Sequence, residues 1–208
     1  VMLLFALKIL SPGNVALIRG NHETRNPYAH VTLHKECMEK YGNPNVWRYI
    51  CAVYNALPIG AVVGERVFCV HGGLSPDLKF LIEINGLDRR GDLPEDGPIT
   101  DLLWSDPSDI VGFAPSQRKA GKLFGPDVLD TFLKKNKLSY IVRSHQMVPE
   151  GYRRLFDDKL FTVFSAPDYH GIGSNQGAYM IIDKALGVSF RMIELFNPEE
   201  WSSSAEPL

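Results

Sequence analysis

The sequence is poor in several features that would assign it to a special class of protein. It has 3 cysteines in 208 residues and no C-x-x-C pattern, which argues against a secreted disulfide framework and favours a reducing compartment. Its apolar opening run, Val1–Leu10, contains Lys8 and is too short to span a bilayer. Neither sign of charge dominates, since 22 basic side chains face 24 acidic ones, and this balance argues against a broad nucleic-acid surface. These absences leave a globular domain of ordinary composition, 45% hydrophobic and 22% charged.

Three common catalytic motifs are also missing. His71-Gly72-Gly73 looks like an esterase oxyanion loop, but no G-x-S-x-G elbow supplies a nucleophilic serine. The segment Gly171–Gly177 misses the spacing of a dinucleotide-binding loop by one residue, and no P-loop occurs. Serine hydrolase, dinucleotide-binding and P-loop chemistries are therefore poorly supported.

Helical and strand patterns run through the whole chain, which predicts mixed α/β layers. Helical spacing or helix-stop signals mark four segments, and short apolar runs bounded by turn residues mark seven strands. We expect helices at Val1–Leu10 (buried), Tyr28–Tyr41, Asn45–Leu57 and Pro126–Lys135, and strands at Val15–Ile18, Ile59–Val63, Val67–Val70, Tyr140–Val142, Leu160–Phe164, Ala178–Ile182 and Val188–Leu195. Between them, the segment 76–122 is rich in Gly, Pro and Asp and is expected to form loops and short helices.

Four of the expected strands end in a short cluster of polar side chains. The clusters are Arg19–Glu23, His71–Gly73, Arg143–His145 and Ser165–His170. Open α/β sheets bind ligands just outside the carboxyl ends of their strands, so these clusters are expected to share one pocket. Imidazole nitrogen together with amide oxygen suits Mn, Fe or Zn and is a poor match to calcium. A single histidine after a strand is more often a packing residue than a metal ligand. A metal site is favoured here because histidines recur in the clusters at several strand ends.

The clusters occur in the order seen in a known enzyme family. The ordered motifs are Gly20-Asn-His-Glu23, His71-Gly-Gly73 with Leu74-Ser-Pro76, Leu102-Leu-Trp-Ser-Asp-Pro107, Arg143-Ser-His145 and Ser165-Ala-Pro-Asp-Tyr169. The chain resembles the metal-dependent serine/threonine protein phosphatases, and Lys40–Trp47 looks most like their type 2A branch. The resemblance implies a calcineurin-like metallophosphatase fold, an α/β (α+β) β-sandwich of two mixed sheets flanked by helices. It further implies a partial catalytic domain at 1–196. The tail at 197–208 contains three glutamates, three serines and two prolines, a composition that predicts disorder.

The resemblance also implies a reaction and its cofactors. Two divalent metal ions (Mn, Fe or Zn) would activate a water that attacks phosphoserine or phosphothreonine in line. Asn21, His71 and His145 correspond to three ligands of one metal, and Asn21 also to a substrate contact. His22 corresponds to the general acid that protonates the leaving serine or threonine oxygen.

Three further residues match positions around the substrate. Arg118 corresponds to an arginine that grips the phosphate, Tyr169 to a tyrosine on a bordering loop, and Asp106 to part of an acidic groove. The partners implied are phosphorylated protein substrates and regulatory or scaffolding subunits, with no nucleic acid and no membrane. The location implied is cytoplasmic, with the nucleus left open.

Two motifs of the family have no counterpart in this sequence. They are an upstream G-D-x-H-G and G-D-x-x-D-R-G, which supply the first metal's ligands, the bridging aspartate and the carboxylate paired with the general acid. We therefore expect the N-terminal part of the domain to be missing and the chain alone to be inactive. A binding module that recognises phosphoproteins without hydrolysing them is the alternative. Lys119 and Asp168 replace a glycine and an asparagine that are usual in the family, and His170 stands where many members have cysteine.

Overall fold

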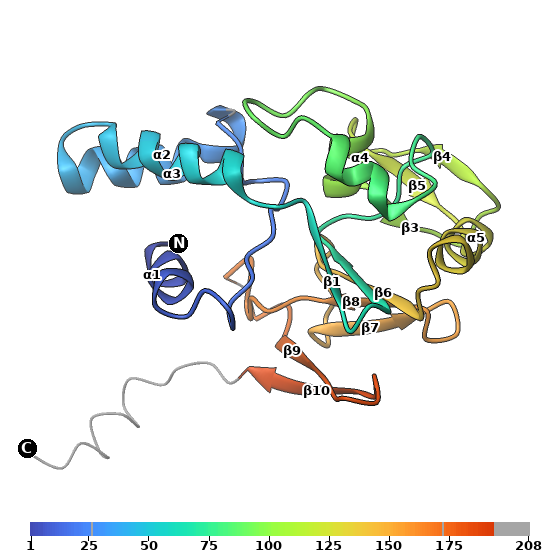
Figure 1. Ribbon diagram of the computed structural model, residues 1–208. Coiled ribbons are helices and arrows are strands. Elements are labelled where there is room, and N and C mark those ends of the chain that lie inside the picture. Colours follow the sequence, from blue (N-terminus) through green and yellow to red (C-terminus); the bar gives the residue numbers. More distant parts are fainter. Residues whose placement is uncertain (26, 172, 194–208) are drawn as a thin grey trace, which may run out of the picture. The chain divides into compact units, whose positions relative to one another are not determined.

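The computed structural model describes residues 1–25, 27–171 and 173–193, with the backbone alone for 27–32 (Figure 1). The helices are α1 (Met2–Leu10), α2 (Pro27–Tyr41), α3 (Asn45–Ala56), α4 (Pro98–Trp104) and α5 (Pro126–Asn136), with a 3-10 helix η1 at Leu81–Gly86. The strands are β1 (Gly60–Val63), β2 (Val67–Val70), β3 (Asp106–Pro107), β4 (Phe113–Pro115), β5 (Lys122–Phe124), β6 (Tyr140–Arg143), β7 (Tyr152–Leu155), β8 (Leu160–Val163), β9 (Gly177–Ile182) and β10 (Val188–Ile193).

The strands form three sheets. A five-stranded sheet has the order β1-β2-β6-β8-β7, a three-stranded sheet the order β3-β5-β4, and β9 pairs with β10. In the large sheet β1 and β2 are antiparallel whereas β2 and β6 are parallel, and in the small sheet β3 is parallel and β4 antiparallel to β5. The expected mixed α/β fold with two mixed sheets and helices is confirmed.

The chain divides into two compact units, each described by itself. The first comprises residues 1–145 and 154–161, and the second comprises the remaining residues. The expected limits of a catalytic domain at 1–196 stay a prediction, and the expected disordered tail at 197–208 lies outside the described residues.

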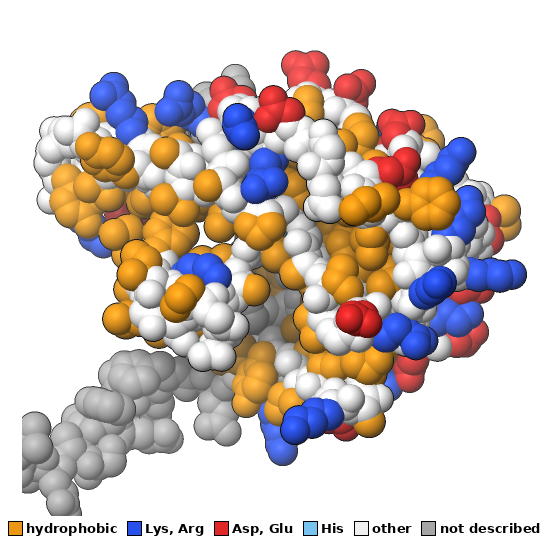
Figure 2. Space-filling model, viewed as in Figure 1, with side chains coloured by type: hydrophobic (Ala, Val, Ile, Leu, Met, Phe, Trp, Pro, Cys, Tyr) orange, Lys and Arg blue, Asp and Glu red, His pale blue; other side chains and the backbone are white. Residues whose placement is uncertain are grey.

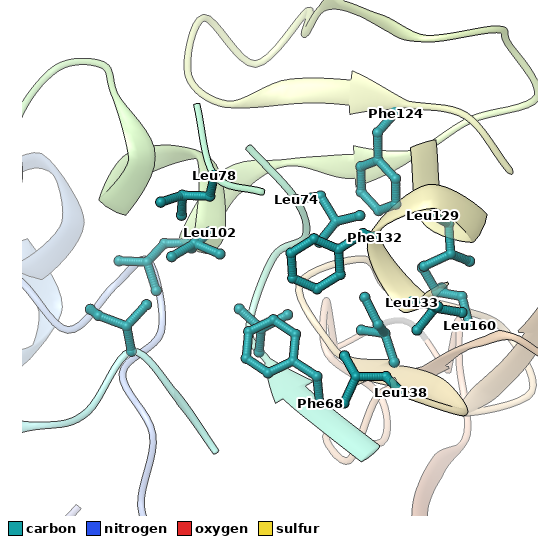
Figure 3. Packing of buried hydrophobic residues seen from close by; sticks show 14 of the residues in the cluster. Phe68, Leu74, Leu78, Leu102, Phe124, Leu129, Phe132, Leu133, Leu138 and Leu160 are labelled. Carbon is teal, nitrogen blue, oxygen red and sulfur yellow. The ribbon is translucent and has the colours of Figure 1, made fainter. Parts of the chain in front are cut away.

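A core of leucines, isoleucines and phenylalanines lies between α5 and the strands of the first unit (Figure 3). Helix α5 begins with Pro126 at its first position, as the sequence predicts, and its last residue, Asn136, is followed by Lys137 in the left-handed conformation. Its Phe132 meets Phe68 of β2 with ring centroids 6.0 Å apart. Leu129 of α5 and Phe124 of β5 are fully buried, so α5 connects the large and small sheets through apolar contacts.

The expected hairpin between Val67 and the preceding strand is also present. Gly64 and Glu65 both have positive φ, and Arg66 donates its backbone N–H to the carbonyl of Val63 at 3.2 Å. Two positive φ values in succession are typical of the type I′ turn, which matches the twist of the two strands.

Two expectations about the first residues are wrong. Helix α1 forms, but none of its residues is buried; Leu3 is 71% and Leu10 80% exposed. Residues 15–18 form no strand in the described structure, and the Val15 carbonyl accepts a hydrogen bond from the Lys8 ammonium instead. A helix satisfies its own backbone, whereas a strand needs a neighbouring strand, so α1 forms uncovered and residues 15–18 do not pair.

The second unit contains the β9–β10 hairpin. The strands pair antiparallel from Gly177↔Ile193 to Ile182↔Val188, and Asp183 accepts hydrogen bonds from two backbone N–H groups in the turn. Tyr152 stacks on Phe190 of β10 with centroids 3.9 Å apart. Within the described ranges, every helix falls short of the length and apolar character needed to cross a bilayer.

Candidate metal and phosphate site

Asn21 and His71, which are 50 residues apart in sequence, lie side by side in the first unit. His71 Nε2 is 2.8 Å from Asn21 Oδ1, and the Asn21 side chain is almost completely buried. Gly20 makes this approach possible, because a Cβ at that position would lie 2.3 Å from the Glu23 carboxylate and 3.1 Å from His71 Nδ1. A glycine before Asn21 therefore leaves room for the imidazole.

His145 joins this pair because β2 and β6 are parallel neighbours that end at the same edge of the sheet. The backbone N–H of Ser144 donates to the carbonyl of His71 at 3.1 Å, which ties the two strand ends together. The imidazoles of His71 and His145 have centroids 5.2 Å apart. His145 adopts a positive φ of 62°, a conformation that is uncommon outside glycine and that is often found at functional sites. The structure thus brings together the three predicted ligands of one metal.

The chemical state of these histidines fits a divalent metal. Burial, reinforced by the nearby Arg143 charge, lowers the pKa of His71 to about 4 and that of His145 to about 3, so both are neutral at pH 7. Among the described residues, His145 Nε2 is a buried nitrogen with no hydrogen-bond partner. Neutral imidazole is the form that binds metal, and two ligands at right angles on one ion lie about 3 Å apart, which suits Asn21 and His71.

The described residues contain no other strong candidate. Groups of three or more His, Cys, Asp or Glu side chains that could hold a metal ion do not occur among them. The set formed by Asn21, His71 and His145 has two imidazoles and one amide, so only two of its three side chains belong to those four residue types. Three protein ligands leave positions open, as catalytic metal sites do.

Helix α4 packs directly on the glycine turn that follows His71. The backbone N–H groups of Gly72 and Gly73 both donate to the carbonyl of Leu102. A Cβ on Gly72 would lie 2.5 Å from the backbone carbon of Leu103, which leaves no space for any side chain. The two glycines therefore let the end of α4 approach the site, and with it Trp104, Ser105 and Asp106.

Asp106 bridges two arginines at the end of α4. Arg143, fully buried, donates to Asp106 Oδ1 at 2.7 Å and to the carbonyl of Gly72 at 2.7 Å. Arg118 donates from Nε to Asp106 Oδ2, also at 2.7 Å. The Arg118 side chain is 40% exposed, and its terminal nitrogens have no hydrogen-bond partner among the described residues. This fits its predicted role in binding phosphate, because those nitrogens can each bond a phosphoryl oxygen.

The expectation that Asp106 belongs to an acidic groove needs correction. Its side chain is 5% exposed, and both carboxylate oxygens are paired with guanidinium groups. Paired and buried in this way, Asp106 orients the two arginines and presents no free negative charge to solvent. A direct contact of Asp106 with substrate stays a prediction.

His22 lies on the same turn as Asn21, and its side chain is exposed. Its ring centroid is 6.4 Å from that of Trp104, and Trp104 in turn contacts His145 edge-on at 5.5 Å. The predicted general acid and a predicted metal ligand thus contact the same indole. The site of the first unit therefore combines the three predicted metal ligands, an accessible imidazole and a partly exposed guanidinium.

Sequence reasoning did not give Trp104 or Arg143 a role, although both stand in the recognised motifs. The sequence could have predicted that Arg143 pairs with other polar groups, because a charged residue at the end of a buried strand needs buried partners. Apart from its motif, nothing in the sequence predicted a role for Trp104 at the site, because an aromatic residue at the end of a helix usually belongs to a hydrophobic core.

Tyr169 belongs to the second unit. Its backbone N–H donates to Asn175 Oδ1 at 3.0 Å, and its ring contacts Phe164 edge-on at 5.2 Å while remaining 55% exposed. Asp168 accepts a hydrogen bond from the backbone of Gly173 on the same loop. The predicted contact of Tyr169 with substrate stays a prediction.

Comparison with known proteins gives a consistent result. A family model described as calcineurin-like phosphoesterase matches residues 1–149. The serine/threonine-protein phosphatase 4 catalytic subunit of Kluyveromyces lactis is 46% identical over 193 residues, which cover 93% of this chain and 63% of that protein. The protein of the same name from Saccharomyces cerevisiae is 45% identical over 193 residues, with the same coverage.

A solved structure supports the same relationship. It is a serine/threonine phosphatase from Saccharomyces cerevisiae described as similar to human phosphatase PP5, and it matches with a TM-score of 0.85 and 33% identity over 94% of this chain and 65% of that one. The chain thus spans less than two thirds of the length of these relatives. The resemblance to serine/threonine phosphatases near the type 2A branch is confirmed. On the match to residues 1–149, which include Asn21, His71 and His145, the chain belongs to the calcineurin-like phosphoesterase family.

Proposed function

We propose that the chain is the larger part of a protein serine/threonine phosphatase that hydrolyses phosphoserine and phosphothreonine in proteins. The observation that carries the proposal is the convergence of Asn21, His71 and His145 close to Arg118. Arg118 pairs with Asp106, and Asp106 also pairs with Arg143, which lies two residues before His145 in the sequence. The names of the similar proteins support the same activity.

Each residue has a role that follows from its position. Divalent metal ions, when bound, polarise the phosphoryl oxygens and activate water. Asn21, His71 and His145 would hold one ion through Oδ1 and ring nitrogens, and the family resemblance implies that Asn21 also contacts the phosphate. The terminal nitrogens of Arg118 would bind phosphoryl oxygens, with Asp106 holding Nε. His22 would donate a ring N–H proton to the departing oxygen.

The described residues offer ligands to one ion, and a bridging water needs two. We therefore propose that the 208-residue chain alone does not hydrolyse its substrate. Substrates are proposed to be phosphoproteins, with regulatory or scaffolding subunits as further partners. A cytoplasmic location, with the nucleus left open, is proposed from the three free cysteines and is tested by imaging a fluorescent fusion.

The deciding experiment joins the chain to the upstream segment of the Kluyveromyces lactis relative. This extended chain should release phosphate from a phosphoserine protein when manganese is present. The matched control carries His71→Asn, which removes a proposed ligand and should abolish release. An extended chain that folds and binds manganese but releases no phosphate would contradict the proposal.

The alternative is a module that binds phosphoproteins without hydrolysing them. The observation that favours it is that three ligands for one ion, together with Arg118, are enough to bind a phosphate group. Binding of a phosphoserine peptide that depends on Arg118, in an extended chain without phosphate release, is the result this alternative requires.

A further inference from the structure

A cavity lies in the first unit, between the last turns of α3 and the segment that runs from the end of η1 to Arg90. Its volume is about 620 Å³, and its lining residues are Ala52, Asn55 and Ala56 of α3 together with Asn85, Leu87, Asp88, Arg89 and Arg90. None of the residues assigned above to the metal or the phosphate lines it. We call it the α3 cavity.

The walls of the α3 cavity are held by one buried arginine. Arg19 is fully buried, and its guanidinium donates to Asn55 Oδ1 at 3.2 Å and to the carbonyl of Arg89 at 3.0 Å. A third hydrogen bond, from Nε to the carbonyl of Glu23 at 2.7 Å, anchors Arg19 to the turn that carries His22. Both walls are therefore fixed to each other before any ligand arrives, which reduces the entropy cost of binding.

Positive charge gathers at this cavity. The side chains of Arg89 and Arg90 are exposed, and neither has a hydrogen-bond or ion-pair partner in the described part of the chain. The one carboxylate of the lining, Asp88, accepts the backbone N–H of Arg90 at 3.1 Å. Burial lowers the pKa of Arg19, the negative charges of Glu23 and Asp92 oppose this effect, and the positive charge of Arg89 adds to it.

The floor of the cavity suits a peptide. Ala52 and Ala56 are exposed and small, so a chain can lie against α3 without meeting a long side chain. A volume of about 620 Å³ is far larger than a single inorganic phosphate requires, because a water molecule occupies about 30 Å³. Guanidinium groups bind carboxylates in bidentate fashion, which favours aspartate and glutamate side chains.

We propose that the α3 cavity binds an acidic peptide segment through Arg89 and Arg90. Ala52 and Ala56 provide the surface on which the peptide backbone lies, and Arg19 keeps the two walls in place. The inference does not use the metal site, so it stands or fails separately from the proposed phosphatase activity.

The test is surface plasmon resonance with the chain immobilised at low density, which keeps copies apart. The probe is a short peptide of alternating glutamate and alanine, and the reference probe has glutamine in place of glutamate. The acidic peptide should bind and the glutamine peptide should not. The double variant Arg89→Glu, Arg90→Glu should weaken binding by about tenfold or more, since charge-assisted hydrogen bonds become repulsions.

Two further variants keep the result specific to the cavity. Ala52→Trp fills the cavity and leaves both arginines in place, so it should also weaken binding about tenfold. The matched control Arg66→Glu, Arg153→Glu makes the same change of charge at two exposed positions elsewhere and should change binding less than about twofold. Three results would each overturn the proposal: no binding of the acidic peptide, an equal loss in the control, or unchanged binding in Ala52→Trp.

Discussion

Arg118 and Asp106 form an ion pair in which the guanidinium uses only its Nε, at 2.7 Å from Oδ2. The second carboxylate oxygen is occupied by the buried Arg143, so a single aspartate fixes one arginine inside the fold and another at its surface. The ion pair thereby orients the Arg118 side chain and leaves its two terminal nitrogens able to bind a phosphate. This relationship has consequences for stability as well as for phosphate binding.

Replacing Asp106 by Asn should destabilise the fold by about 3–5 kcal/mol, because it leaves the buried Arg143 guanidinium without its counter-charge. Unfolding by denaturant, followed by circular dichroism, measures the change. The control is Arg118→Gln, which breaks the more exposed pair and should alter stability by less than about 1 kcal/mol. Equal effects of the two variants would show that Asp106 does not act through Arg143.

Metal binding should depend on the three converging ligands. Cobalt is titrated into the chain, and visible absorption reports how much of it is bound. The affinity for cobalt should fall about tenfold or more in His145→Asn and in Asn21→Ala. His34→Asn serves as the control, because that ring packs edge-on against Trp47 and takes no part in the site. A cobalt affinity that is unchanged in both His145→Asn and Asn21→Ala would refute the assignment.

The glycine at position 72 should be intolerant of a side chain. A Cβ there would lie 2.5 Å from the Leu103 backbone, which cannot move aside easily, so Gly72→Ala should destabilise the fold by about 1–3 kcal/mol. Gly86→Ala is the matched control, since a Cβ on Gly86 would have nothing within 4 Å and the φ of this residue is not positive. Thermal unfolding midpoints compare the two, and a Gly72→Ala variant as stable as Gly86→Ala would contradict the close approach of α4.

Burial of Asp101 should make stability depend on pH. Burial raises the pKa of this carboxyl above its usual value of 3.8, against the opposing hydrogen bond donated by Ser75 Oγ at 2.7 Å. The folded chain therefore favours the neutral carboxyl of Asp101. The fold is most stable, with respect to this group, at low pH. That stability is lost as the pH rises from the pKa of Asp101 in the unfolded chain through its higher pKa in the folded chain. Asp101→Asn keeps an acceptor for Ser75 and lacks this loss.

The measurement is the difference in unfolding free energy between Asp101→Asn and the parent chain from about pH 3 to about pH 7, a range that spans the carboxyl titration. This difference should shift in favour of the variant as pH rises. The exposed Asp109→Asn, compared in the same way, should show no such trend. A difference for Asp101→Asn that is flat, or that moves the other way, would contradict the raised pKa.

The apolar surface of α1 should make the isolated chain self-associate. Most side chains of α1 are exposed, and apolar groups gather over α1 and the α2–α3 pair in the space-filling view (Figure 2). Leu3→Lys together with Leu10→Lys should reduce association in light scattering. The control is Ile82→Lys together with Val111→Lys. These two apolar residues lie outside α1 and are 72% and 89% exposed, and their replacement should have little effect on association. A monomeric parent chain with a sharp thermal transition would contradict this expectation.

Much of the fold follows from local patterns. The helix at Asn45, the turn at Gly64-Glu65 and the helix that begins at Pro126 depend on side-chain period and turn chemistry, and all three are present as expected. The small sheet β3-β5-β4 was not expected, because strands of two or three residues carry too little pattern to be distinguished from loops. Strand β7 was not expected because its sequence, Tyr-Arg-Arg-Leu, is neither an apolar run nor a regular alternation.

The site divides in the same way. Asn21, His71 and His145 could be predicted because each belongs to a recognisable motif. The structure then brings His71 and His145 together, because β2 and β6 end at the same edge of the sheet. The buried pairing of Asp106 and the contact of Trp104 with two imidazoles were not predictable from the sequence.

The sequence by itself determined the longer helices and the turn at Gly64-Glu65, the residue types able to bind metal and phosphate, and the family to which the chain belongs. Only the tertiary structure decided that Asp106 is neutralised between Arg118 and Arg143, that α1 is uncovered and that residues 15–18 do not pair. The physical reason is one of range. Helices and turns close hydrogen bonds between near neighbours, whereas burial, ion pairing and strand pairing depend on which distant segments the fold brings into contact.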